Sequence, residues 1–301
     1  MRLSVGLPVY NGERFLREAI DSILGQGFED FELIVSDNAS TDSTGEICRE
    51  YASRDPRVVY LRNPENRGAA WNHNRLVELA RGTLFKWIGA DDVYRPEYFA
   101  RCVEELDRDP GAVLAYPRTI VIDETGTKTS EYIPDWDLRS PEPYERLRIV
   151  IPRIGNFNAD AETGVIRLEA MRRTRLLPRY YGGDKRLLGE LSLLGTFIEV
   201  PEYLMLRRIH RGASSQNHPY RARVGSNSTA WTVEFFKGSA RMAFLPSWSL
   251  LWDHVVTAWS SKLSLLQKLR LTGFVVRVCR WNQGVLFSEL SGMARSLLHR
   301  A

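Results

Sequence analysis

The chain has 301 residues, of which 44% are hydrophobic and 26% are charged, and its 41 Lys and Arg outnumber 37 Asp and Glu. This composition is typical of a globular protein with a buried core, and it excludes an intrinsically disordered or fibrous chain. The net charge of +4 is unevenly distributed, because residues 240–301 contain eight basic and two acidic side chains and so carry +6, which leaves −2 for the rest.

The cysteines and the apolar segments bear on the cellular compartment. Cys48, Cys102 and Cys279 are widely spaced and odd in number, which argues against a disulfide framework and for a reducing environment. The N-terminus lacks a signal-peptide core, and no uninterrupted apolar run is long enough to span a bilayer. We therefore expect a cytoplasmic protein, and peripheral contact with the inner face of the membrane is left open by the basic C-terminal residues.

The first hundred residues alternate short β-branched or aromatic runs with helical patterns. We expect strands at residues 3–7, 31–35, 58–61 and 84–88, and helices at residues 14–24, 43–51, 69–80 and 96–106. Pro96 is expected at the first helical position of its helix, and Ser40 or Thr41 is expected to cap the helix at 43–51. This alternation predicts βαβ units and a mostly parallel sheet, whose ligands bind beyond the carboxyl ends of the strands.

The pattern changes from residue 112 onward. We expect strands at 113–116, 119–122, 197–200 and 203–208, a turn at 123–126, an irregular region at 130–160 and a helix at 184–194. A loop is expected from 212 to about 229, followed by helices to the end. No internal repeat is present.

Asp91 and Asp92 lie directly after the fourth predicted strand, where two adjacent carboxylates repel each other. A Mg²⁺ or Mn²⁺ ion would relieve this repulsion, because hard cations take oxygen ligands and a substrate diphosphate completes their shell. The alternative is an acidic pair that helps the following helix to begin. Sequence features of other nucleotide sites are absent: no Walker A loop is present, and the first strand is not followed by G-x-G-x-x-G.

Asp37 ends the second predicted strand, and its short carboxylate could accept the ring N–H of a nucleotide base. The alternative is a turn, because the sequence DNASTD at residues 37–42 is typical of turns and helix caps. Polar loops follow the first, second and fourth strands of one predicted sheet edge. Their coincidence favours a ligand site over three unrelated turns.

The N-terminal third of the sequence resembles a known family. Residues 3–106 resemble the nucleotide-sugar-binding half of the family 2 glycosyltransferases, which have the GT-A fold. The resemblance rests on LPVYN at 7–11, IVSDNASTD at 34–42, NRG at 66–68 and WIGADD at 87–92, in family-like order and spacing. It implies an α/β GT-A fold with a Rossmann-like, mostly parallel sheet flanked by helices, followed by a C-terminal helical extension.

The resemblance also implies a division of the chain and roles for individual residues. It divides the chain into a nucleotide-sugar-binding half (1–110), an acceptor-binding half (111–230) and the helical extension (231–301). The nucleotide-sugar residues that it implies are Pro8, Tyr10, Glu13, Asp37 and Asp91, and Asp92 is the implied metal ligand. Many family members carry a further Asp where this chain has Gly89.

The second half resembles the family more weakly. The family's catalytic base is usually an Asp at the start of a helix beneath the acceptor, and Asp184 matches that position although Gly183 replaces the usual Glu. The alternative for Asp184 is a plain N-cap. His210 follows a predicted strand and could reach the metal or the diphosphate, beside arginines that would suit phosphate recognition. Arg67 is a further candidate contact to the diphosphate or the base.

These residues predict a metal-assisted single displacement that inverts the anomeric configuration. A UDP-sugar is the expected donor, with dTDP and GDP sugars as alternatives, Mn²⁺ or Mg²⁺ as the expected ion, and a saccharide, a lipid-linked compound or another hydroxyl compound as acceptor. A binding protein without transferase activity remains an alternative because Gly89 and Gly183 replace acids. Nucleic-acid binding through the basic C-terminal residues is not expected, because they lack an interleaved aromatic–basic motif.

The basic C-terminal helices have two interpretations. Apolar positions between Leu263 and Leu286 alternate with basic ones, and such a helix can lie on an anionic membrane surface. Alternatively, these helices pack on the catalytic body or form a homodimer interface. The sequence leaves both open.

Overall fold

The computed structural model describes residues 1–133, 138–152, 160–211, 234–235, 237 and 245–298. The loop expected from 212 to about 229 lies outside the described residues, as do parts of the region expected to be irregular at 130–160. Within the described residues, no helix combines the length and the hydropathy that a membrane-spanning segment needs.

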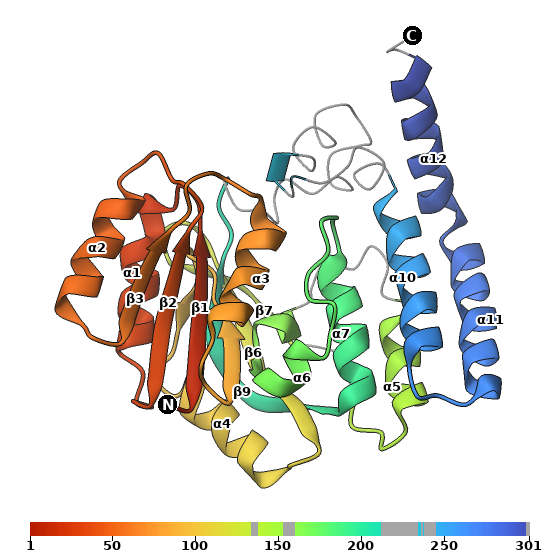
Figure 1. Ribbon diagram of the computed structural model, residues 1–301, viewed down its shortest axis with the longest axis horizontal. Coiled ribbons are helices and arrows are strands. Elements are labelled where there is room, and N and C mark those ends of the chain that lie inside the picture. The colour runs from red at the N-terminus through yellow and green to blue at the C-terminus, as the bar shows by residue number, and fades with distance from the viewer. Residues whose placement is uncertain (134–137, 153–159, 212–233, 236, 238–244, 299–301) are drawn as a thin grey trace.

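A single mixed sheet forms the centre of the described chain, with nine strands in the order β3-β2-β1-β4-β8-β6-β9-β5 and β7 paired to β6 (Figure 1). The strands are β1 Leu3–Val9, β2 Phe31–Asp37, β3 Val58–Arg62, β4 Leu84–Trp87, β5 Val93–Tyr94, β6 Ala112–Ile122, β7 Lys128–Tyr132, β8 Val165–Arg167 and β9 Thr196–Arg208. The first four pair in parallel, as do β6 and β9, whereas β5, β7 and β8 pair antiparallel. This arrangement confirms the expected mostly parallel α/β sheet.

Helices cover the sheet, and three more follow it at the C-terminal end (Figure 1). The helices are α1 Glu13–Leu24, α2 Thr44–Arg54, α3 Ala69–Leu79, α4 Tyr98–Arg108, α5 Pro143–Val150, α6 Leu168–Arg172, α7 Gly183–Leu194, α10 Pro246–Ser260, α11 Leu265–Trp281 and α12 Gln283–Leu298, with a 3-10 turn at Asp160–Thr163. The C-terminal helical extension is therefore present.

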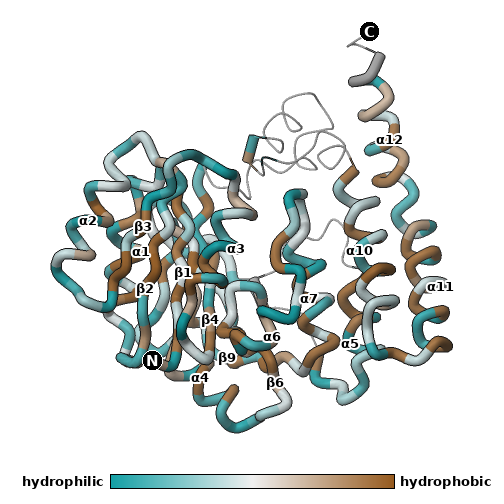
Figure 2. Tube along the Cα trace, viewed as in Figure 1, coloured by the Kyte–Doolittle hydropathy of each residue, from teal (hydrophilic) through white to brown (hydrophobic). Residues whose placement is uncertain are grey.

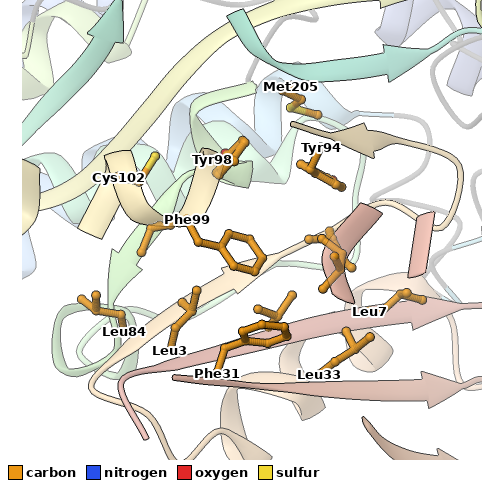
Figure 3. Packing of buried hydrophobic residues seen from close by; sticks show 14 of the residues in the cluster. Leu3, Leu7, Phe31, Leu33, Leu84, Tyr94, Tyr98, Phe99, Cys102 and Met205 are labelled. Atoms are coloured by element: carbon orange, nitrogen blue, oxygen red, sulfur yellow. The ribbon is translucent and has the colours of Figure 1, made fainter. Parts of the chain in front are cut away.

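Side chains that alternate along the central strands fill two hydrophobic clusters. In β2, Leu33 belongs to one cluster and its neighbour Ile34 to the other, because successive side chains of a strand point to opposite faces. Figure 3 shows the first cluster, in which Phe31 and Phe99 meet edge to face at 5.4 Å. α1, α2 and α4 contribute to the first cluster, and α3, α6 and α7 contribute to the second.

Several local expectations were wrong. α4 begins at Tyr98, so Pro96 precedes the helix instead of occupying its first position. α2 begins after Ser43, so neither Ser40 nor Thr41 caps it. The strand pairs expected at 113–122 and 197–208 are the continuous strands β6 and β9, which shift register around Pro117 and Arg118. The region at 130–160 contains α5, and the sequence patterns did not predict β5, β7, β8 or α6.

Candidate active site

A cavity of about 690 Å³ opens at the carboxyl ends of β1 and β4. The loop between β4 and β5, the chain just after β9 and the start of α7 complete its walls. Of the residues singled out from the sequence, it is lined by Pro8, Tyr10, Asp91, Asp92, Asp184 and His210. The sheet therefore brings together residues that are up to 202 positions apart in the sequence, at the edge where ligands of parallel sheets bind.

Asp91 and Asp92 are held by the last residue of β9 and by His210 just after the strand. Oδ1 of Asp92 accepts a hydrogen bond from the backbone N–H of Arg208 at 2.9 Å, and His210 Nε2 hydrogen-bonds Oδ2 of Asp91 at 3.0 Å. Asp92 is 8% exposed. Because β5 separates these acids from α4, they do not lie at a helix start, and the helix-capping alternative for the pair is wrong.

The backbone of Gly89 lies against both carboxylates. A Cβ atom built on Gly89 would lie 2.6 Å from Oδ2 of Asp92 and 3.0 Å from Oδ1 of Asp91. An oxygen of each carboxylate therefore lies beside the Gly89 backbone, and oxygen donors are the ligands that Mn²⁺ and Mg²⁺ take. Within the described residues no three His, Cys, Asp or Glu side chains are gathered closely enough to hold an ion by themselves. A cation held by Asp91 and Asp92 would therefore need further ligands from outside these side chains, such as substrate oxygens.

Arg208 is a buried structural arginine that links this site to the N-terminal half. Its Nε donates to the carbonyl of Asp91 at 3.0 Å, its Nη2 donates to Glu18 at 2.7 Å, and its guanidinium lies 4.7 Å from the centre of the Phe15 ring. The side chain is 2% exposed. These contacts show that Arg208 supports the aspartates from the end of β9, and the phosphate-recognition role considered for the arginines near His210 stays a prediction.

His210 packs beside the same aromatic ring. The ring centres of His210 and Phe15 are 4.8 Å apart, and the His210 side chain is 14% exposed. Its Nε2 is engaged by Asp91 in this arrangement. His210 thus lies within reach of the aspartates, and its role as a metal ligand stays a prediction.

Asp184 is the second residue of α7, which begins at Gly183 after the N-cap Gly182. It is therefore not the N-cap, and within the described chain no hydrogen bond engages its carboxylate. Gly182 has φ +80°, a left-handed conformation that favours glycine. The helix start thus places an available carboxylate at the cavity wall.

The absence of a Glu at position 183 has a steric reason. A Cβ atom on Gly183 would lie 2.2 Å from Cγ of Pro178 and 2.5 Å from its Cδ. These distances are far below van der Waals contact, so no larger residue fits unless Pro178 moves. The departure from the family pattern at Gly183 is therefore built into the packing of this segment.

Asp37, Glu13 and Arg67 do not line the cavity. Asp37 is fully buried, and its carboxylate accepts hydrogen bonds from Ser40 N at 2.8 Å, Tyr60 Oη at 2.8 Å and Arg62 Nη1 at 2.6 Å.

The side chains of Glu13 and Arg67 have local partners. Glu13 accepts a hydrogen bond from Ser43 N at 2.9 Å, and the Arg67 guanidinium lies 4.3 Å from the centre of the Trp71 ring. Glu13 begins α1 and Arg67 lies in the loop before α3, and the nucleotide-binding roles of both residues stay predictions.

Lys86 is a buried residue near the site that the sequence patterns did not single out. It is fully buried in β4, its Nζ donates to the carbonyl of Thr163, and it lies 3.9 Å from the centre of the Tyr98 ring. Burial lowers the pKa of Lys86 to about 7, and the negative charge of Asp92 partly opposes this. A lysine inside an otherwise apolar strand was the available sequence signal.

Both the sequence comparisons and the structure comparisons find glycosyltransferases that are similar to this chain. The family model described as glycosyl transferase family 2 matches residues 4–174. An uncharacterized glycosyltransferase of Methanocaldococcus jannaschii is 31% identical over 135 residues, which cover 44% of this chain and 47% of that protein. The chain thus spans less than half the length of this relative.

Two solved structures are similar over most of the chain. Residues 1–349 of S. aureus TarS in complex with UDP-GlcNAc match with a TM-score of 0.68 and 15% identity, covering 93% of this chain and 72% of that one. The mannosyltransferase PcManGT of Pyrobaculum calidifontis in complex with GDP-Man and Mn²⁺ matches with a TM-score of 0.56 and 18% identity, covering 100% and 88%. At these identities the similarity establishes the fold, and it confirms the expected GT-A architecture.

Proposed function

This chain belongs to glycosyl transferase family 2, and on that premise we propose that it is an inverting glycosyltransferase that moves a sugar from a nucleotide-sugar donor to an acceptor hydroxyl. One observation carries the proposal. Asp91, Asp92 and His210 lie on one cavity with Asp184, so a diphosphate-binding group and a candidate base share a single space.

The proposed donor is a UDP-sugar, which binds with its nucleotide along the loops that follow β1 and β2. In this assignment Pro8 and Tyr10 contact the nucleotide at the cavity, Asp91 lies near the ribose, and Asp37 reads the base from its buried position. Glu13 and Arg67 are assigned as further contacts to the nucleotide sugar. TarS with UDP-GlcNAc supports UDP, whereas PcManGT with GDP-Man keeps GDP as an alternative, and dTDP follows from the sequence-based expectation.

The proposed chemistry is a single displacement with Asp184 as general base. Its carboxylate accepts the proton of the acceptor hydroxyl while that oxygen forms a bond to the anomeric carbon. The bond from the anomeric carbon to the diphosphate oxygen breaks, and its electron pair leaves with the nucleoside diphosphate. Attack from the side opposite the leaving group inverts the anomeric centre.

Asp92 is the proposed principal ligand of a divalent cation, Mn²⁺ or Mg²⁺, with His210 as a further donor. When bound, the cation stabilises the negative charge that develops on the departing diphosphate. The protein's own contribution is to fix the Asp92 carboxylate, since Arg208 holds one of its oxygens and Gly89 leaves room beside the other. The Mn²⁺ in PcManGT supports this assignment.

The acceptor is proposed to be a saccharide, a lipid-linked compound or another hydroxyl compound, as in the assembly of a polysaccharide or glycoconjugate. Tyr181 and Leu177 line the same cavity as Asp184. Aromatic and apolar side chains of this kind suit the faces of a sugar ring. A cytoplasmic location remains the expectation from the sequence.

A screen of UDP-, GDP- and dTDP-sugars for enzyme-dependent hydrolysis, with and without Mn²⁺, tests the proposal. We expect turnover with one nucleotide class that requires the metal, and a loss on the order of 10²-fold or more in both Asp92→Asn and Asp184→Asn. Asp107→Asn, at a half-exposed carboxylate outside the cavity, is the matched control and should keep full activity.

The outcomes separate the alternatives. Calorimetric binding of a nucleotide sugar without turnover of any donor or acceptor would favour a binding protein that lacks transferase activity. Wild-type transfer by both Asp92→Asn and Asp184→Asn would overturn the assigned roles. Equal losses in Asp107→Asn would attribute the effect to folding.

A further inference from the structure

Most of the exposed large apolar side chains of this protein lie on its C-terminal helices. Thirteen such side chains are exposed within the described residues, and ten of them fall between Trp248 and Leu290. In Figure 1, α11 and α12 form the edge of the molecule farthest from β1–β3, and Figure 2 shows apolar residues along them. Exposed apolar surface on this scale marks an interaction site.

α11 has one apolar surface that packs inward and a second that faces outward. Leu271, Val275 and Val278 are buried in the cluster that joins α5, α10, α11 and α12. Leu265, Leu266, Leu269 and Val276, each more than half exposed, lie on the other side of the helix, and we call this surface the α11 outer face. A helix with buried residues on one side needs no such outward set for its own packing.

Arginines interleave with these apolar side chains. Arg270, Arg277 and Arg280 are exposed, and at 3.6 residues per turn they fall on the same side of α11 as Leu266 and Leu269. Trp281, 63% exposed, ends the helix beside them. The combination of basic, leucine and tryptophan side chains is typical of a helix that lies in a membrane interface.

The acidic side chains of the three helices do not offset these charges. Between residues 245 and 295 the acids are Asp253 and Glu289, and both are largely buried. Asp253 pairs with Arg175, and Glu289 accepts a hydrogen bond from Ser247 N at 3.1 Å. The exposed surface of the described C-terminal helices therefore carries positive charge only.

We propose that the α11 outer face binds the surface of an anionic phospholipid membrane. The cations are complementary to lipid phosphates, and the leucines and tryptophan enter the boundary between headgroups and acyl chains. A symmetric contact with a second copy would bring the three arginines of one copy close to the three arginines of the other, with no exposed carboxylate between them. Charge repulsion opposes such a contact. This inference goes beyond the proposed function and does not depend on transfer activity.

Vesicle co-sedimentation of the full-length chain tests the proposal. We expect binding to vesicles of phosphatidylglycerol and phosphatidylcholine, little binding to phosphatidylcholine alone, and weaker binding as salt is raised. R270Q/R277Q/R280Q should weaken binding about fivefold per arginine, on the order of 100-fold in total. L265S/L269S/V276S should abolish vesicle binding, and its thermal unfolding midpoint should equal that of the wild type.

The matched control removes three exposed arginines elsewhere. R54Q/R108Q/R148Q changes the same net charge at side chains of α2, α4 and α5 that are 47% to 70% exposed. If this control weakens binding as much as the α11 variant does, the attraction is a property of net charge and the proposal is overturned. A dimer that L265S/L269S/V276S dissociates, without vesicle binding by the wild type, would overturn it in favour of a second copy.

Discussion

Gly89 and Gly183 lie at positions where neighbouring atoms leave little room for a side chain. Both positions carry an acid in many members of the family that this chain resembles. In this structure a Cβ at either position would collide, with Asp92 at Gly89 and with Pro178 at Gly183. The carboxylates of Asp91, Asp92 and Asp184 at the cavity are therefore arranged around two glycines.

Substitution at Gly183 tests this packing directly. Gly183→Ala should lower the free energy of unfolding by about 1–3 kcal/mol, because the added methyl group overlaps the ring of Pro178. Pro178→Ala removes the two ring carbons that collide, so the double variant should recover much of the loss. Urea denaturation of the four proteins gives the coupling between the two sites. Additive losses would show that Pro178 is not the obstacle.

His254 should make the stability of the fold pH-dependent. It is fully buried in α10, neither ring nitrogen is hydrogen-bonded to a described residue, and burial lowers the pKa of His254 to about 4. Because this pKa lies below the unfolded value of 6.5, the unfolded chain binds a proton first as the pH falls. The imidazole therefore destabilises the fold progressively between about pH 6.5 and pH 4, by up to about 3 kcal/mol.

The pH effect can be isolated by comparison with His254→Leu. Urea unfolding of both proteins at several pH values between 7 and 4 should show that the wild type loses more stability than the variant. Subtracting one stability curve from the other removes the contribution of the titrating groups that both proteins share. Parallel curves would contradict a buried neutral imidazole at this position.

At the scale of elements, an ion-pair network joins α10 to the segment that precedes Asp184. Oδ2 of Asp253 in α10 accepts a hydrogen bond from Tyr180 Oη at 2.5 Å, and Asp253 pairs with Arg175 at 3.1 Å and Arg186 at 3.5 Å. Burial and the charge of Asp253 raise the pKa of Tyr180, which keeps its hydroxyl proton in place. α10 thus holds the chain that leads into α7.

Asp253→Asn should therefore affect both stability and turnover. The substitution leaves two arginines with one negative partner fewer, which we expect to cost about 1–3 kcal/mol of unfolding free energy. Since residues 177–184 carry the proposed base, kcat for transfer should fall while KM for the donor changes little. Thermal melts and donor-saturation kinetics check both parts.

The control for this network is Glu145→Gln, which breaks an exposed ion pair with Arg148 on α5. Surface pairs of this kind contribute little, so stability and kcat should stay near the wild-type values. Loss of stability in Asp253→Asn at unchanged kcat would limit the network to a structural role. Tyr180→Phe removes only the hydroxyl and should shift kcat in the same direction.

At the scale of the whole molecule, the positive charge and the chemistry occupy different regions. The surplus of +6 belongs to residues 240–301, whereas the cavity lies in the slightly acidic remainder. The sheet crosses residue 110 through the pairing of β4 with β8 and of β5 with β9, and the C-terminal helices share a core with α5. The domain boundaries expected from the sequence stay predictions, and the vesicle experiment above is the test that belongs to this scale.

The sequence by itself determined the alternating units and the loops that carry the candidate site residues. β-branched runs and helical periodicity are local properties, so β1 to β4 and α1 to α3 were predictable to within a few residues. Asp91, Asp92 and Asp184 were identified because each follows or begins a recognisable element in a familiar motif. Short elements such as β5 and β8 were missed, since their formation depends on partners that are distant in the sequence.

Only the tertiary structure decided which of these residues meet. The cavity joins Asp91 with Asp184 and His210, while Asp37, Glu13 and Arg67 lie outside its lining. The buried contacts of Arg208 with the Asp91 carbonyl and Glu18, and the close approach of Pro178 to Gly183, became visible only in the structure. Side-chain convergence, burial and close approach depend on contacts between segments far apart along the chain, and such contacts are set by the packing of the whole fold.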